Sequence, residues 1–158
     1  MSGTAIRRIL AVDFGDARTG LAATDWTGSI AVPLPRLDAR DDQVVIAAVA
    51  ALVRERDAQV VVLGMPLTVD GSQGQRAQRT AAFRERLQAA LPVPVVAVDE
   101  SHSTDEAHER LKQGGLKAKR RKDLADSVAA LVILERYRQT MRRSPGAAPP
   151  PDDPPPPA

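Results

Sequence analysis

The chain has 158 residues, a net charge of +2 and 43% hydrophobic residues, a composition typical of one globular domain and unlike that of a disordered chain. It contains no cysteine, which excludes disulfides and thiolate metal sites and is typical of proteins of the reducing cytoplasm. No apolar run reaches the roughly 18 residues that a membrane span requires, so we expect a cytoplasmic protein without membrane contact.

Three short strands are predicted first, over residues 8–14, 20–24 and 30–37. Joints that contain glycine separate them, so consecutive strands should pair as hairpins. Pro33 and Pro35 favour an edge position for the third strand, because proline lacks the N–H that a central strand must donate.

The pattern then alternates between helix and strand. Apolar residues recur at helical spacing behind a cap at Asp41 or Asp42, and a β-branched run over 60–64 predicts a strand covered on both faces. A helix over about 74–91 and a strand over 93–100 follow. With right-handed crossovers, this order gives a mixed five-stranded sheet, made of a three-strand meander and two parallel strands, with helices on both faces.

The remaining segments are predicted to be two helices and a tail. Ser103 begins a capping box for a helix that ends at the glycine pair 114–115, and the last helix covers about 123–141. The folded domain is expected to span residues 5–141. The proline-rich segment 142–158 has no capacity for a core and should be a disordered, polyproline-like tail.

Three carboxylates are predicted to converge on one edge of this sheet. Asp13 ends the first strand and Glu100 follows the fifth; since these strands run parallel, both acids should lie at the carboxyl edge, where the first turn of the last helix would bring Asp126. Three neighbouring carboxylates repel one another unless a cation joins them, and hard oxygen ligands favour Mg²⁺ or Mn²⁺. Two such ions about 4 Å apart can activate a water and stabilise the leaving oxygen of a phosphodiester. Taken singly, Asp13 fits equally well as a turn residue, while Glu100 fits better as a surface carboxylate and Asp126 as an acid at a helix start.

Glycines and basic residues near these acids suggest a phosphate-bearing ligand. Gly15 and Gly20 would let a phosphate backbone approach the first strand, and the joint 63–76 could cradle a phosphate or be an ordinary turn. Five acids within 99–109 are followed by six bases within 112–122. The basic run is a candidate for a flexible clamp that reads the charge of nucleic acid without reading sequence, although a solvated helix and loop would show the same pattern.

Other catalytic schemes lack their residues. There is no cysteine nucleophile and no glycine-lysine phosphate loop. The two histidines, His102 and His108, are six residues apart, a poor spacing for two ligands on one helix face.

Four blocks together resemble the YqgF family of RNase H-like nucleases, over residues 6–137. In order they are "AVDFGDARTGLA", "VLGMPLTVDGSQGQRAQR", "VVAVDESHST" and "KDLADSVAALVILERY". Members of this family are described as Holliday-junction-resolvase-like proteins and as nucleases for the 5′ end of pre-16S rRNA. The resemblance implies an RNase H-like fold, Asp13, Glu100 and Asp126 as metal-binding acids, and a site lined by Arg18 and by Asp70 and Gly71.

The chain departs from the family pattern at Ser101, where the family usually has arginine after the acid of the third block. A site cation is therefore missing or supplied from elsewhere. His102 is one candidate to replace it. The others are the bases of the run that we expect to bind nucleic acid, namely Lys117, Lys119, Arg120, Arg121 and Lys122.

The leading hypothesis is a metal-dependent endonuclease that leaves 3′-hydroxyl and 5′-phosphate ends on precursor rRNA or branched DNA. Symmetric cutting of a junction would require a homodimer, whereas trimming an rRNA end would not. One alternative is a non-catalytic nucleic-acid-binding factor with the same fold. Another is an ATP-binding protein of the actin and sugar-kinase type, whose first phosphate loop "DFGDARTG" resembles; that type needs two such lobes, and this chain supplies one.

Overall fold

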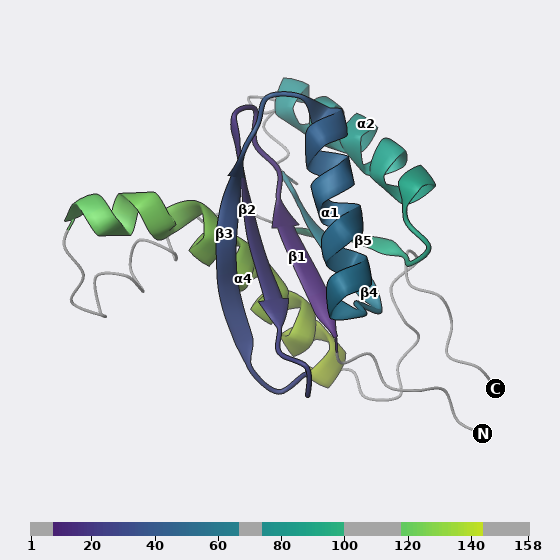
Figure 1. Cartoon of the computed structure of the whole chain (residues 1–158), viewed down its shortest axis with the longest axis vertical. Coiled ribbons are helices and arrows are strands. Elements are labelled where there is room, and N and C mark those ends of the chain that lie inside the picture. The colour runs from purple at the N-terminus through teal and green to yellow at the C-terminus, as the bar shows by residue number, and fades with distance from the viewer. Residues whose placement is uncertain (1–7, 67–73, 100–117, 144–158) are drawn as a thin grey trace.

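The computed structural model describes residues 8–66, 74–99 and 118–143, with the side chains of the last segment described for residues 127–141. Five strands form one sheet in the order β3-β2-β1-β4-β5 (Figure 1). Their bounds are β1 Ile9–Asp13, β2 Arg18–Thr24, β3 Ala31–Asp38, β4 Val60–Met65 and β5 Val95–Asp99. β1, β2 and β3 form an antiparallel meander, while β4 runs parallel to both β1 and β5. The predicted mixed sheet is confirmed.

The two edges of the sheet are protected in different ways. β3 lies at one edge, as its prolines predicted. At the other edge, β5 uses side chains of a neighbouring helix: the Val95 N–H donates to Gln88 Oε1 at 2.8 Å, and Arg84 Nη2 donates to the Val95 carbonyl at 2.9 Å. These bonds occupy backbone groups that an exposed edge would offer to another chain.

Helices cover both faces of the sheet, as predicted. α1 (Asp42–Arg56) and α2 (Gly74–Ala90) lie on one face, and α4 (Ala118–Arg143) crosses the other (Figure 1). A core of Val and Leu side chains with Phe14 and Phe83 fills the first interface, and a smaller core that includes Tyr137 fills the second. None of the helices in the described part of the chain is long and apolar enough to cross a bilayer.

Local sequence explains where α1 begins and ends. The cap is Asp41, the first of the two predicted aspartates, whose Oδ1 accepts the Gln43 N–H at 2.9 Å. The helix ends at Asp57, which adopts a left-handed conformation with φ of 52°. Aspartate tolerates this conformation better than most side chains, and the following N–H of Ala58 bonds to the Val53 carbonyl at 3.0 Å.

The last helix begins earlier than predicted, at Ala118 and not near residue 123. Alanine, lysine and arginine are strong helix formers, so the basic run 118–122 continues the helix and does not form the flexible segment that its charge suggested. The prediction that Asp126 lies in the first turn is therefore wrong: it lies more than two turns inside α4. The helix predicted to begin at Ser103 lies outside the described residues. Of the predicted tail 142–158, the first two residues belong to α4 and the others lie outside the described residues.

Candidate active site at the carboxyl end of the sheet

Asp13 is the last residue of β1 and lies at the carboxyl end of the parallel strands, as predicted. In β1, Ile9 and Ala11 belong to the core under α4, whereas Leu10 and Val12 belong to the core under the other helices. By strand alternation, Asp13 points to the α4 face. Its side chain is 13% exposed, so this carboxylate is sheltered but still reachable from solvent.

The turn after Asp13 explains one of the two glycines. A Cβ at Gly15 would lie 2.3 Å from the carbonyl oxygen of Arg18, so any other residue would force the backbone of this turn apart. Gly15 is required by the chain's own backbone, a different reason from the phosphate approach inferred from sequence. Gly20 pairs directly with Asp13 across the β1–β2 ladder.

Phe14 fixes the end of β1 against α2. The rings of Phe14 and Phe83, the only phenylalanines in the chain, stack with centroids 3.9 Å apart and planes 6° apart. Arg79, one turn before Phe83 on the same helix, places its guanidinium carbon 5.2 Å from the Phe14 ring centre. The residue next to Asp13 is thus held by two side chains of α2.

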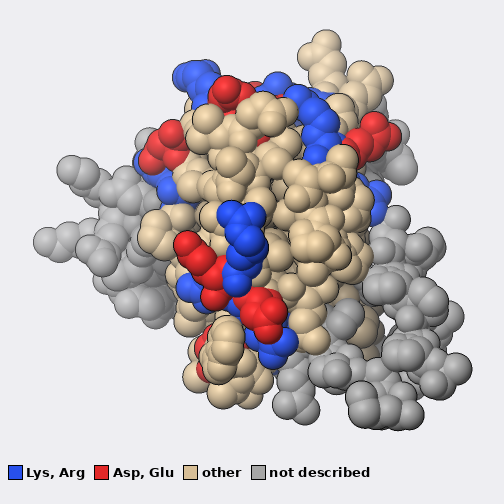
Figure 2. Space-filling model, turned by 45° about the vertical axis from the view of Figure 1, so that its right-hand side comes forward, with Lys and Arg blue, Asp and Glu red and all other residues tan. Residues whose placement is uncertain are grey.

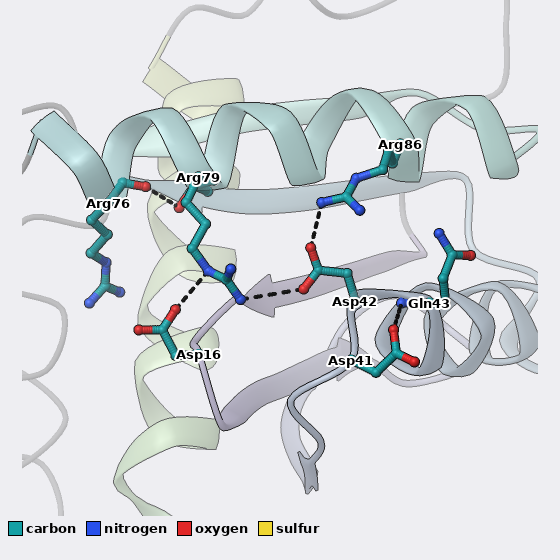
Figure 3. Close-up of polar contacts among 8 residues, drawn as sticks. Asp16, Asp41, Asp42, Gln43, Arg76, Arg79 and Arg86 are labelled. Atoms are coloured by element: carbon teal, nitrogen blue, oxygen red, sulfur yellow. Dashed lines mark hydrogen bonds and ion pairs between the residues drawn. The ribbon is translucent and has the colours of Figure 1, made fainter.

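Ion pairs extend this junction to α1 (Figure 3). Arg79 Nε lies 2.7 Å from Asp16 Oδ1 and its Nη2 lies 3.4 Å from Asp42 Oδ1, while Arg86 Nη2 lies 2.5 Å from Asp42 Oδ2. The Asp16 side chain is 80% exposed, so solvent weakens that pair. Asp42 is 13% exposed and shared by two arginines, and it ties the start of α1 to α2.

A further arginine of α2 reaches Asp13 itself. Arg76 Nη2 lies 4.0 Å from Asp13 Oδ1, at the outer limit of an ion pair. Figure 3 shows Arg76, Arg79 and Arg86 extending from the same side of α2. Arg76 and Arg79 also line a surface hollow whose other walls are Phe14, Gly15, Asp16 and Thr80.

On the opposite face, side chains of α4 form hydrogen bonds with backbone carbonyls of the sheet. The buried Ser127 Oγ donates to the Leu34 carbonyl at 2.6 Å, and Arg136 Nη1 donates to the Asp99 carbonyl at 2.9 Å. The first bond lies next to Asp126 in the chain. The second fixes the last residue of β5, directly before Glu100.

The structure brings together fewer of the predicted residues than the sequence listed. Arg18 is the exposed first residue of β2, at the same end of the sheet as Asp13. Glu100, Asp70, Gly71 and Lys117 lie outside the described residues. Four other predicted bases are placed by their backbones in the first turns of α4, namely Lys119, Arg120, Arg121 and Lys122.

Sequence reasoning missed the arginines of α2. Arg76, Arg79, Phe83 and Arg86 follow one another at three-, four- and three-residue steps, the spacing of a single helix stripe. That spacing was readable, but the acids that the arginines meet come from distant segments. Only the fold shows that Arg79 meets Asp16 and that Arg86 meets the start of α1.

The described surface carries both signs of charge. Figure 2 shows acidic and basic side chains side by side at the upper end of the face it presents, with a second mixed group lower down. Arginine–carboxylate pairs account for such mixing at the end of the sheet that holds Asp13. On this face, attraction of a polyanion therefore depends on individual arginines and not on a block of positive charge.

Comparisons with known proteins place this geometry in context. A family model described as "RuvX: Holliday junction resolvase" matches residues 7–140. A protein of Synechococcus sp. (strain JA-3-3Ab) named "Putative pre-16S rRNA nuclease" is 42% identical over 135 residues, which cover 85% of each chain. A protein of the same name from Syntrophus aciditrophicus (strain SB) is 36% identical over 130 residues, covering 82% of this chain and 87% of its own.

The fold is also found in solved structures. "T. thermophilus RuvC in complex with Holliday junction substrate" superposes with a TM-score of 0.55 at 16% identity, covering 84% of this chain and 95% of that one. At this identity the likeness concerns the fold alone.

Proposed function

The chain belongs to the RuvX family of Holliday junction resolvases, the YqgF family that its motifs predicted, and on this premise we propose that it is a metal-dependent endonuclease. One observation carries the proposal. Asp13 is a sheltered carboxylate at the carboxyl end of the central parallel strands, the edge at which α/β sheets bind their ligands.

Glu100 and Asp126 complete the proposed acid set. The strand register aligns Asp13 with the row that holds Val98 of β5, and Glu100, outside the described residues, follows two positions later in the sequence. Position 126 precedes Ala130 by one helical turn, on the stripe of α4 that packs against the sheet. These placements support a set of three acids gathered around Asp13.

The chemistry of the donors fits a hard divalent cation. Carboxylate oxygens suit Mg²⁺ and Mn²⁺, and the 13% exposure of Asp13 leaves access for an ion. When bound, such ions would lower the pKa of water and offset charge on the phosphoryl oxygens. The chain's own part is to hold the three acids in place: the Phe14–Phe83 stack fixes the end of β1, and Ser127 and Arg136 fasten α4.

The proposed substrate is a nucleic acid, either the precursor of 16S rRNA or a four-way DNA junction. The two relatives described above are named for pre-16S rRNA, and the RuvC structure described above contains a Holliday junction. Hydrolysis would leave 3′-hydroxyl and 5′-phosphate ends. We assign backbone contacts to Arg18, to the 70–71 loop and to the basic residues within 117–122, since phosphate contacts position a substrate without reading its sequence.

The same proposal specifies which residues are needed for cleavage and how many copies of the chain act together. Residues 5–141 would suffice for cleavage, and the segment from residue 142 onward would be dispensable. A homodimer would serve the cutting of two strands of a junction, whereas one copy would serve the cutting of an rRNA 5′ end.

The test is a cleavage assay on a 5′-extended rRNA fragment and on a four-way junction, each with Mg²⁺, with Mn²⁺ and with EDTA. Changing the partner of a metal ligand typically costs 10- to 100-fold, so we expect loss of a ligand itself, in Asp13→Asn, to slow cleavage by at least about 100-fold. Asp25→Asn is the matched control, since Asp25 lies in the turn at the far end of β2.

Two results would count against the proposal. Equal cleavage by wild-type protein and Asp13→Asn would point to a contaminating nuclease. Salt-sensitive binding that persists in EDTA, without cleavage in any metal, would favour the non-catalytic binding factor, for which the serine at position 101 is the sequence argument.

A further inference from the structure

Large apolar side chains gather at the end of the sheet opposite Asp13. Of the four that are exposed in the described part of the chain, three lie there: Trp26 and Ile30 in the loop between β2 and β3, and Met141 in the last turn of α4. Trp26 is 69% exposed and Ile30 60%. We call these three residues the hairpin patch. Apolar side chains grouped on a surface indicate a contact, whereas scattered single ones need no explanation.

The course of α4 brings Met141 to this end of the sheet. Figure 1 shows α4 crossing the sheet towards the hairpin of β2 and β3, where Arg138 Nη2 donates to the Ser29 carbonyl at 3.2 Å. Met141 follows the buried Tyr137 by four residues, so it continues the stripe of α4 that packs against the sheet. Met141 is nevertheless 40% exposed, because this stripe extends past the hairpin.

The Trp26 ring is held in position before any partner arrives. The guanidinium carbon of Arg8 lies 5.8 Å from the centre of the ring. Asp57 fixes this arginine, since Arg8 Nη2 lies 3.2 Å from Asp57 Oδ2 and Arg8 Nε donates to the Asp57 carbonyl at 2.8 Å. A ring that is already positioned loses little freedom on binding, so most of the energy of a new contact is retained.

A proline-rich segment leaves the chain beside this patch. Residues 144–158 follow directly after Arg143, the last residue of α4, and hold eight of the chain's thirteen prolines. In the polyproline conformation expected for this segment, residues three apart share a face. One such face would contain only apolar residues, namely Pro145, Ala148, Pro151, Pro154 and Pro157. The two acids of the segment, Asp152 and Asp153, would fall on the other two faces.

The chemistry, reach and charge of this segment fit the patch. Polyproline helices bind to exposed aromatic side chains, because the helix is ordered before it binds. Arg143 lies five residues beyond Arg138, about 8 Å along the helix axis, and an extended tail spans up to about 45 Å. The segment contains two acids and no base, and Arg138 places a positive charge beside the hairpin.

We infer that residues 144–158 dock on the hairpin patch of the same chain, with the proline face against the indole of Trp26 and the acid pair towards Arg138. The contact lies at the opposite end of the sheet from Asp13, so it does not depend on the proposed function. It covers apolar surface that would otherwise be open to other chains.

Trp26 is the only tryptophan in the chain, so its fluorescence reports on the patch alone. Acrylamide quenching would be compared between the full chain and a chain that ends at Arg143. A tethered segment has an effective concentration in the millimolar range, enough to occupy a weak site about half of the time. We therefore expect truncation to raise the quenching constant by about twofold and to move the emission to longer wavelength.

Two double variants of the full chain provide a matched comparison, because both keep its length, charge and proline count. The first combines Pro151→Ser with Pro154→Ser on the apolar face, and the second combines Pro150→Ser with Pro156→Ser on the face that holds Asp153. We expect the first to be quenched as the truncated chain is and the second to stay close to wild type. Thermal unfolding shows that each variant is folded, and if the truncated chain is not, the serine variants decide.

Several results would overturn the inference. Equal quenching of the full and truncated chains would do so, as would equal effects of the two double variants. Shielding of Trp26 that rises with protein concentration would assign the patch to a second copy of the chain. Shielding that is lost when residues 1–6 are removed, and kept without the tail, would assign it to the N-terminal segment. Shielding that appears only on addition of a single-stranded oligonucleotide would assign the ring to nucleic acid.

Discussion

Two carboxylates at opposite ends of the sheet, Asp25 and Asp42, are held in different ways. At the end away from Asp13, Asp25 accepts the backbone N–H groups of Ser29 and Ile30 at 3.0 and 3.1 Å and the hydroxyl of Thr27 at 2.9 Å. All three partners lie within five residues along the chain. These hydrogen bonds stabilise the turn between β2 and β3.

At the carboxyl end, Asp42 and Asp13 contact side chains from a distant helix. Asp42 is paired with Arg79 and Arg86, which are 37 and 44 residues away, and Asp13 faces Arg76. Guanidinium groups on flexible stems can change position, whereas the backbone donors of a turn are fixed by the turn itself. The comparison teaches that Asp25 depends on its own turn alone, whereas the position of Asp42 depends on how α1 and α2 pack together.

The largest expected effect contrasts an aromatic residue at each end. Phe83 is fully buried against Phe14 beside the candidate site, whereas Trp26 at the far hairpin is 69% exposed. We expect Phe83→Ala to lower the free energy of unfolding by about 3–5 kcal/mol through loss of packing and the cavity it leaves. Trp26→Ala should cost at most about 1 kcal/mol, the value of its contact with Arg8. Equal losses in urea titrations would show that the stack does not hold α2.

A smaller effect contrasts the two ends of α1. Asp41→Ala removes the acceptor of the Gln43 N–H and should cost about 1 kcal/mol. Asp57→Gly should change stability by less than about 0.5 kcal/mol, since glycine relieves the left-handed φ of 52° while the exposed pair with Arg8 is lost. Denaturation midpoints of the two variants test this ranking, and a larger loss for Asp57→Gly would reverse it.

The smallest effect concerns acid. The hydrogen bond from the Ile30 N–H, together with those from Thr27 and Ser29, lowers the pKa of Asp25 below its usual 3.8. A lowered pKa means that the ionised form stabilises the folded state, in full above about pH 4 and progressively less as the pH falls through the folded pKa. Asp25→Asn should therefore be less stable than wild type at pH 6, and the difference should shrink as the pH is lowered through the folded-state pKa. A difference that grows as the pH falls would contradict the assigned sign.

Much of the fold was readable from sequence because its signals are local. The β-branched run 60–64 predicted a doubly covered strand, and Pro33 and Pro35 predicted an edge. The start of α4 was misplaced because a cluster of lysine and arginine was interpreted by its charge, although both residues favour helix. The composition of such a run does not reveal whether the helix that follows it extends back through the charged residues.

The candidate site was only partly readable. The position of Asp13 follows from where an apolar run stops, and the structure confirms it. Arg76 and Arg79 pair with Asp13 and Asp16, some sixty residues earlier in the chain. The sequence does not reveal such pairings, because they depend on how the elements pack. The sequence analysis attributed Gly15 to the approach of a phosphate, whereas the structure shows that the Arg18 carbonyl leaves no room for a side chain there.

The central claim is that Asp13, Glu100 and Asp126 together bind divalent ions. A crystal soaked in MnCl₂, with anomalous scattering recorded at the manganese edge, tests it most directly. The account predicts an anomalous peak within about 2.5 Å of the Asp13 carboxylate, with the other two carboxylates in the same coordination shell. A map without a peak at Asp13, or with Glu100 and Asp126 directed away from it, would contradict the account.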